Sequence, residues 1–345
     1  MSKLKLPTDY RPALDVLTTE KAIKRLKDYF EVAIADELYL QRVTAPVMVL
    51  SGTGINDDLN GVERPVSFGI RDMQEKRAEV VHSLAKWKRM KLATLGLEPG
   101  RGIYTDMNAL RPDEELTNLH SVYVDQWDWE VTIKPSDRNL EYLKRTVKRI
   151  FRVFKRTEEH ISKEFPVLKK RLPDFITFIH AEELRQRFPD LTPKEREDRI
   201  AKEHGAVFII GVGGALADGT IHDGRAADYD DWTTETTPGY RGLNGDIIFW
   251  HPELEQAFEV SSMGIRVDQA TLLTQLDIRK ENHKKDLLFH RTLLEGKLPF
   301  TMGGGIGQSR TCMFLLHKVH IGEVQAGIWP EEMFAQCLEA GIQLL

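Results

Sequence analysis

Residues 102–130 read GIYTDMNALRPDEELTNLHSVYVDQWDWE. Apolar and polar residues alternate in two runs, 102–110 and 121–129, and a polar turn that begins at Arg111 joins the two runs. Two alternating runs on either side of a polar turn predict a pair of antiparallel strands. Arg111 opens the turn, where its planar guanidinium group can bind two phosphate oxygens at once.

The returning strand is expected to carry a polar face. Side chains alternate along a strand, so Gln126, Asp128 and Glu130 point to the same side. A row of one amide and two carboxylates is unsuited to a hydrophobic core. It forms either a polar pocket or an ordinary solvated surface, and these residues alone favour neither.

The rest of the chain predicts one continuous domain of the α/β class (α+β type), residues 18–345, after an extended N-terminal arm, 1–17. Helical spacing of apolar residues from Ile23 to Leu38 predicts a helix that begins near Thr18 or Thr19 and ends before Pro46. Further strands are expected at 43–50, 78–84, 175–179, 206–212, 246–250 and 257–261. Further helices are expected at 85–95 and around 143–154. Another should run from a capping box at 192–195 to Gly205, and a last one should begin at 312.

The predicted helix around residues 143–154 has a strongly basic outer face. Its cations are Lys144, Arg145, Lys148, Arg149, Arg152, Lys155 and Arg156. A solvated helix face is the favoured interpretation, and a site for an anionic partner such as RNA is the alternative. The carboxylates that follow, Glu158, Glu159 and Glu164, weaken the alternative.

A glycine cluster, residues 303–310 (GGGIGQSR), is predicted as a turn that opens a helix. Glycines let a backbone approach a ligand closely, and the start of a helix attracts anions. A dinucleotide-binding fingerprint would need a strand before the glycines and a following βαβ unit, and a Walker loop would need Gly-Lys-Ser/Thr. The sequence lacks both patterns, and the glycines alone indicate no more than a turn.

Acidic residues gather in the last third of the chain. They are Asp223, Asp228, Asp230, Asp231, Asp246 and Glu259. Asp246 and Glu259 lie on successive predicted strands, where two carboxylates can hold Mg²⁺ together with substrate phosphates. The cluster at 228–231 is more typical of a solvated loop.

Composition narrows the class of protein. The chain has 345 residues, 41% of them hydrophobic, and a net charge of −5, which disfavours a nucleic-acid partner. No apolar run is long enough to span a membrane, and residues 1–15 do not resemble a signal peptide. Cys312 and Cys337 show neither metal-site nor disulfide spacing, so we expect a soluble protein of the reducing cytoplasm.

Taken in order, these segments resemble motifs 1, 2 and 3 of class II aminoacyl-tRNA synthetases. Gln126-Trp127-Asp128 is similar to the Gln-x-Asp of aspartyl-tRNA synthetases, and the glycines with Arg310 are similar to motif 3. The closer resemblance, over nearly the whole chain, is to ammonia-dependent asparagine synthetases. It rests on VVHSLAKWKR at 80–89, ALRPDE at 109–114, HSVYVDQWDWE at 120–130, DYDDW at 228–232, GLNGDI at 242–247 and SSMGIRV at 261–267.

The resemblance implies a class II synthetase-like antiparallel β-sheet flanked by helices, with 18–345 as the catalytic domain. It implies ATP-dependent amidation of L-aspartate by ammonia through a β-aspartyl-adenylate, with Mg²⁺ as cofactor, and a homodimer. The implied catalytic residues are Arg111, Arg310, Asp57 and Lys88. The implied aspartate site is Asp57, Lys88, Gln126, Asp128, Asp230, Ser262 and Arg266. The implied ATP site is Arg111, Asp246, Glu259, Gly303, Gly305, Gly307 and Arg310, with Asp246 and Glu259 as metal ligands.

Two alternative functions predict different sequence features. A tRNA-charging enzyme requires an anticodon-binding domain, for which residues 18–345 leave no room. A silent regulatory or RNA-binding paralogue would have lost Arg111, Arg310, Asp246 or Glu259, and all four are present. Position 2 is Ser2 rather than the cysteine nucleophile of glutamine-dependent enzymes, so we expect ammonia rather than glutamine to be the nitrogen source.

Overall fold

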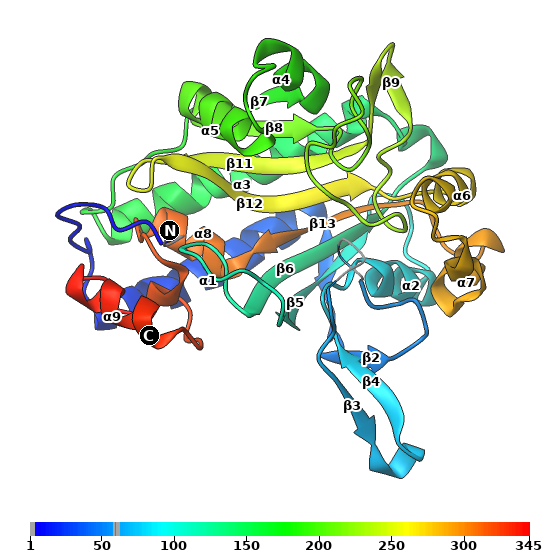
Figure 1. Cartoon of the computed structure of the whole chain (residues 1–345), viewed down its shortest axis with the longest axis horizontal. Coiled ribbons are helices and arrows are strands. Elements are labelled where there is room, and N and C mark those ends of the chain that lie inside the picture. Colours follow the sequence, from blue (N-terminus) through cyan, green and yellow to red (C-terminus); the bar gives the residue numbers. More distant parts are fainter. Residues whose placement is uncertain (1–3, 58, 60–62) are drawn as a thin grey trace.

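A large mixed sheet forms the centre of the protein. The computed structural model describes residues 4–57, 59 and 63–345. The strand order is β1-β5-β6-β13-β12-β11-β8-β7, with antiparallel pairing throughout except at the two edges, where β1 and β7 run parallel to their neighbours (Figure 1). The bounds are β1 Leu40–Arg42, β5 Gly102–Leu110, β6 Tyr123–Thr132, β7 Thr177–His180, β8 Ala206–Ile210, β11 Asn244–His251, β12 Gln256–Ile265 and β13 Thr301–Gly307. The predicted antiparallel pair is confirmed as β5 and β6.

Two long helices, α1 (Val16–Leu38) and α3 (Leu140–Glu164), lie side by side along one face of this sheet (Figure 1). Phe30 of α1 stacks on Trp127 of β6 with ring centroids 4.4 Å apart and also contacts Phe154 of α3 at 5.1 Å. The apolar stripe of α1 is therefore internal core. Asp15 caps the helix by accepting a hydrogen bond from the Thr18 amide at 2.9 Å, so the predicted helix is confirmed but begins at Val16, slightly before the expected start near Thr18.

The basic face of α3 is partly neutralised within the chain. Arg149, Arg152 and Arg156 all contact Glu37 of α1, at 3.5, 2.8 and 2.9 Å. Carboxylates that pair with these cations reduce the positive charge offered to a phosphate backbone. The contacts therefore support the interpretation of a solvated helix face.

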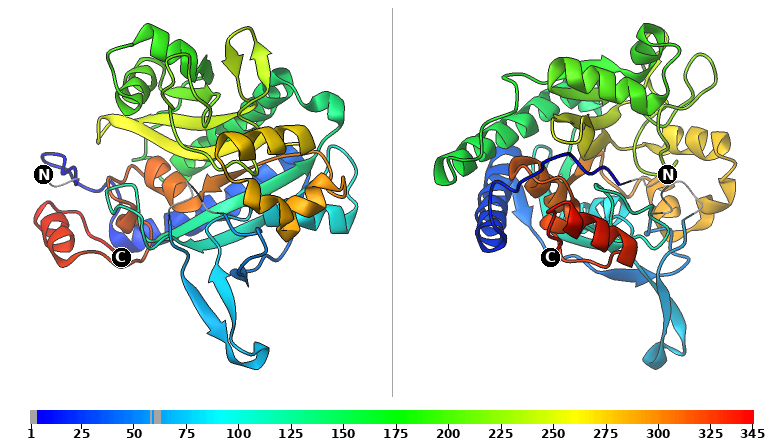
Figure 2. Two further views of the ribbon diagram at one scale, coloured as in Figure 1. Left: turned by 45° about the vertical axis from the view of Figure 1, so that its right-hand side comes forward. Right: turned by 60° about the vertical axis from the view of Figure 1, so that its left-hand side comes forward.

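A second, three-stranded sheet projects from the body as an arm (Figure 2). It consists of β2 (Met48–Leu50), β3 (Ser67–Ile70) and β4 (Lys76–Val80). The single strand predicted at 43–50 is wrong, because Pro46 has no amide hydrogen for a ladder and the chain passes there from the large sheet to the arm. The strand predicted at 78–84 ends at Val80. The many turn-forming residues at 52–61 predict a polar loop, and of these positions 58, 60 and 61 lie outside the described residues.

The glycine cluster is a strand rather than the predicted turn. Residues 303–305 pair with β6 on one side and β12 on the other. A Cβ atom on Gly304 would lie 2.5 Å from the Cβ atom of Met263, so the neighbouring strand leaves room only for glycine. The helix that follows, α8 (Gln308–Leu315), begins directly at the strand end.

Smaller helices cover the other face and the ends of the sheet. They are α2 (Ala85–Leu95), α4 (Ala181–Arg187), α5 (Pro193–His204), α6 (Gln269–Ile278), α7 (Leu288–Leu294) and α9 (Glu331–Glu339), and a short hairpin contains β9 (Glu235–Thr237) and β10 (Tyr240–Arg241). The capping box of α5 is confirmed, because Thr192 and Glu195 exchange hydrogen bonds. Within the described ranges, no helix has the length and apolar character needed to cross a bilayer.

The Phe30→Ala substitution tests the packing of α1. Phe30 is fully buried, so its loss should lower the free energy of unfolding by about 3–5 kcal/mol. Leu17 on the same helix is 75% exposed, and Leu17→Ala should change that free energy by less than about 0.5 kcal/mol. Urea unfolding followed by circular dichroism measures both. Equal effects of the two substitutions would contradict this packing.

Candidate active site

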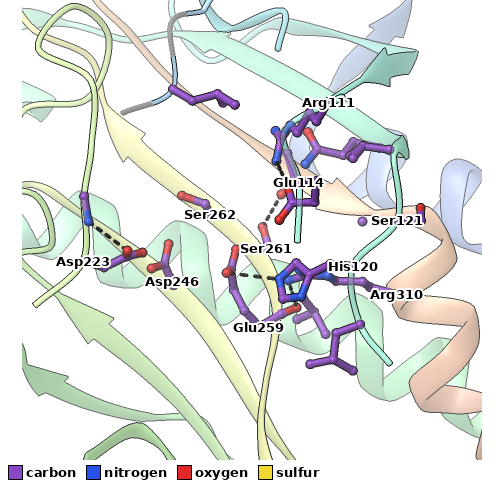
Figure 3. A pocket seen from close by; sticks show the side chains of 18 of the residues that line it. Arg111, Glu114, His120, Ser121, Asp223, Asp246, Glu259, Ser261, Ser262 and Arg310 are labelled. Atoms are coloured by element: carbon purple, nitrogen blue, oxygen red, sulfur yellow. Dashed lines mark hydrogen bonds and ion pairs between the residues drawn. The ribbon is translucent and has the colours of Figure 1, made fainter. Parts of the chain in front are cut away.

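A cavity of about 660 Å³ opens on the sheet face away from α1 and α3. Strands β6, β11, β12 and β13 form its floor, and the loop after β5 and residues 222–225 form its walls (Figure 3). Of the expected site residues, Arg111, Gln126, Asp246, Glu259, Ser262, Gly305, Gly307 and Arg310 line it. Asp57, Lys88, Asp128, Asp230, Arg266 and Gly303 are not among the lining residues.

Two arginines reach the cavity from distant parts of the chain. Arg111 follows β5 and donates a hydrogen bond to the carbonyl oxygen of His82 at 3.2 Å, while its Nε has no partner among the described residues. Arg310 lies in the first turn of α8 and donates to the carbonyl oxygen of Glu259 at 2.8 Å. Each guanidinium group is thus held by a backbone carbonyl and keeps donors for an anion.

Asp246 on β11 has one occupied and one free carboxylate oxygen. Its Oδ2 accepts a hydrogen bond from Arg225 at 2.5 Å, and its buried Oδ1 has no partner in the described part of the chain. Burial raises the pKa of Asp246 to about 7; Arg225 opposes this rise, and repulsion by Glu259 and Asp223 adds to it. A carboxylate in this state gains from a nearby cation.

These carboxylates fit a divalent metal ion. Asp246 and Glu259, on adjacent strands, both line the cavity, and their carboxylates are hard oxygen ligands of the kind that Mg²⁺ prefers. No cluster of three or more His, Cys, Asp or Glu side chains positioned for a metal occurs among residues 4–57, 59 and 63–345. Two protein ligands would therefore need phosphate or water oxygens to complete the coordination shell.

A cluster of buried charges lies next to the cavity floor. Lys88 contacts Asp128 and lies 3.8 Å from Glu130, while Arg266 contacts Asp230 and lies 2.7 Å from Glu130. In this structure the expected aspartate-binding cations and anions therefore neutralise one another. The sequence reasoning placed Glu130 on the polar face but missed it as a site residue, because only the fold shows that it joins the two cations.

Two further expected residues support this cluster or the loop beside it. Asp57 is buried, and its carboxylate accepts hydrogen bonds from the Leu59 amide and from the Ser83 hydroxyl group, each at 2.9 Å. A Cβ atom on Gly303 would lie 1.9 Å from Glu130 Oε2 and 2.6 Å from an Arg266 nitrogen. Gly303 therefore gives the ion pair its space, whereas Gly305 and Gly307 line the cavity.

The sequence did not identify two polar residues of the cavity wall as site residues. Arg225 bridges Asp246 and Asp223, the latter at 2.6 Å. Half-buried His120 lines the wall beside the arginines, and burial together with Arg310, Lys194 and Arg111 lowers its pKa to about 3. The sequence assigned neither residue a role, since each acquires its partners only through the fold.

Together these features define a class. An antiparallel sheet, an arginine at a strand end and a second arginine on the helix after a glycine strand, all around one cavity, are the architecture of class II synthetases. Solved structures support this fold. Asparaginyl-tRNA synthetase from Pyrococcus horikoshii, complexed with asparaginyl-adenylate, matches with a TM-score of 0.66 at 17% identity, over 91% of this chain and 70% of that one. Aspartyl-tRNA synthetase from Entamoeba histolytica matches with a TM-score of 0.61 at 14% identity, over 89% and 58%.

Sequence comparison identifies the family. The family described as aspartate-ammonia ligase matches residues 17–341. Aspartate–ammonia ligases of Parabacteroides distasonis and Clostridium perfringens are each 56% identical, and that of Bacteroides fragilis is 55% identical, over the full length of both chains. The chain therefore belongs to the aspartate–ammonia ligase family, and it is an enzyme of asparagine biosynthesis.

The charge state of His120 is testable by NMR. The pKa of His120 in the folded protein is about 3, below that of an unfolded histidine, so its imidazole should stay neutral down to about pH 4.5. Because the unfolded chain binds this proton at higher pH, the contribution of His120 to the free energy of unfolding should fall as the pH decreases from about 6.5 to about 3. Histidine-labelled protein, with His120→Asn to assign the signal, measures the titration. A midpoint near 6.5 would refute this picture of a cation-surrounded imidazole.

Proposed function

We propose that the enzyme activates the β-carboxylate of L-aspartate with ATP and then transfers it to ammonia. The observation that carries this proposal is that Arg111, Arg310 and Asp246 line one cavity. Such a set of charges suits a magnesium-bound triphosphate. Family membership supports aspartate and ammonia as the other substrates.

The chemistry follows from the low electrophilicity of a carboxylate. An oxygen of the β-carboxylate attacks the α-phosphorus of ATP, the bond to the bridging oxygen breaks, and pyrophosphate leaves. The resulting β-aspartyl-adenylate has a good leaving group on its carbonyl carbon. Ammonia attacks that carbon, loses a proton, and AMP departs to leave asparagine.

The two arginines stabilise the charge that develops at phosphorus. In this proposal Arg111 binds the α-phosphate and the attacking carboxylate oxygen, and Arg310 binds the nucleotide from the side of β12. Asp246 and Glu259 would hold Mg²⁺, which would neutralise phosphate charge. Donors fixed before the reaction stabilise the transition state without reorganisation.

The amino-acid part of aspartate is assigned to the part of the cavity floor formed by β6 and β12. Gln126 and Ser262 line the cavity there, next to the buried ion pairs. Lys88 and Arg266 are proposed to attract the carboxylates of aspartate. The acids and the amide that suit its ammonium group, or the incoming ammonia, are Asp57, Gln126, Asp128 and Asp230.

We further propose a cytoplasmic homodimer that does not bind nucleic acid. The partner contact rests on the resemblance of α1 to motif 1, the helix that forms a two-fold dimer interface in class II synthetases. Because Leu26 and Phe30 are internal, that contact would use outward side chains such as Val32 and Tyr39, each 58% exposed. The net charge of −5 and the pairing of α3 arginines with Glu37 support the absence of a nucleic-acid partner.

The products of ATP cleavage test the mechanism. Incubation with ATP, Mg²⁺, aspartate and ammonia should yield asparagine, AMP and pyrophosphate in equal amounts. Chromatography of the nucleotides, together with amino-acid analysis, measures these yields. Formation of ADP and phosphate would replace the adenylate with an acyl-phosphate intermediate and overturn the proposal.

The Arg111→Lys substitution tests the role of the planar guanidinium group. Lysine keeps the positive charge but cannot bind two oxygens at once, so kcat should fall about 10²- to 10³-fold. Arg101→Lys is the control, because Arg101 is exposed and lies over the Tyr39 ring. If steady-state rates of AMP release are the same for both variants, Arg111 has no part in the chemistry.

A further inference from the structure

Lys194 is a cation of the cavity wall to which the mechanism above gives no role. The lysine and arginine side chains that line the cavity, within the described residues, are Arg111, Lys194, Arg225 and Arg310. Arg225 is buried between Asp223 and Asp246. Lys194 differs from it in being largely solvent-accessible, with 63% of its side chain exposed.

The Lys194 side chain is tethered to the wall at one point. Its Nζ donates a hydrogen bond to Oε2 of Glu197 at 2.7 Å, and the other oxygen of Glu197 lies 3.3 Å from Nε2 of His222. Glu197 and His222 are themselves cavity-lining residues with little exposed surface. An ammonium group has three donors, so two remain for a ligand in the cavity.

Helix electrostatics argue against a purely structural role. Lys194 is the second residue of α5, after the Thr192 cap and Pro193. A cation in the first turn of a helix opposes the helix dipole, and a surface pair three residues apart stabilises a helix by only about 0.2–0.5 kcal/mol. A lysine at this position destabilises the isolated helix. An anion bound in front of the first turn of α5 would offset that cost.

Lys194 lies on the side of the cavity that holds Arg310. Helix α5 packs on β11 and β12, the strands that carry Asp246 and Glu259. Partial burial lowers the pKa of Lys194, but Glu197 and, to a smaller extent, Glu259 raise it above its usual value, and Arg310 opposes that rise. The region proposed to bind aspartate, at the Lys88 and Arg266 cluster, is formed by β6, α2 and the end of β12.

We propose that Lys194 binds the terminal phosphates of ATP and the pyrophosphate that is released. The inference rests on the proposed function and adds a residue that recognises the leaving group. A flexible lysine suits this role because its point charge follows the phosphates, whereas Arg111 is held by the carbonyl of His82. Because the α-phosphate is assigned to Arg111, Lys194 should not contribute to the binding of AMP.

Isothermal titration calorimetry with ATP, pyrophosphate, AMP and aspartate, each in the presence of Mg²⁺, tests this inference. Lys194→Met should weaken binding of ATP and pyrophosphate about 10- to 100-fold, and should leave AMP and aspartate within about twofold. Lys194→Arg should restore part of the loss. Lys202→Met is the matched control, because Lys202 lies on the same helix over the Trp250 ring and outside the cavity lining.

The outcomes separate this inference from the proposed function. If the wild-type protein binds ATP and Lys194→Met binds ATP and pyrophosphate equally well, this inference alone is wrong. Equal weakening of ATP and AMP would also overturn it, since that result indicates a distorted cavity. If the wild-type protein binds neither ATP nor pyrophosphate, the proposed function is wrong. Lys194→Gln repeats the test with a polar side chain should the methionine variant fold poorly.

Discussion

The two faces of β6 set the layout of the molecule. Because side chains alternate, Trp127 packs beneath α1 while its neighbour Asp128 reaches Lys88 on the opposite face. A shift of the strand by one residue would place carboxylates in the apolar core and tryptophans in the cavity, so burial on one side fixes the register on both. The core therefore determines where the charged side chains of the site lie.

The charges beside the cavity are stable only as a set. Lys88, Arg266, Asp128, Glu130 and Asp230 are all buried, and each contacts a group of opposite sign. Removing one partner from a buried pair costs about 3–5 kcal/mol, because it leaves an uncompensated charge. The same mutual pairing orders the wall behind the cavity before any substrate arrives, which is the condition for electrostatic catalysis.

Periodicity and capping chemistry predicted the central helices and strands, and the resemblance to known motifs placed Arg111 and Arg310, which line the same cavity. Predictions from local sequence were wrong where contacts with neighbouring strands determine the structure. The glycine run is a strand because Met263 of β12 fills the space that a side chain on Gly304 would need. Lys194 lies more than fifty residues from Asp246 in sequence, so no motif links them, and only the packing of α5 on β11 brings the two into one cavity.

The charges around Asp246 support the divalent cation of the proposed mechanism. Asp223, Asp246 and Glu259 place three carboxylates here. Arg225 contacts Asp223 and Asp246, and Arg310 lies 3.6 Å from Glu259, so the carboxylates outnumber the guanidinium groups that pair with them. A triphosphate adds more negative charge and would be repelled by the carboxylates alone. A divalent cation held by Asp246 and Glu259 would offset the charge of the carboxylates and would attract the phosphates. Arg225, by occupying Oδ2 of Asp246, leaves Oδ1 as the oxygen available for that cation.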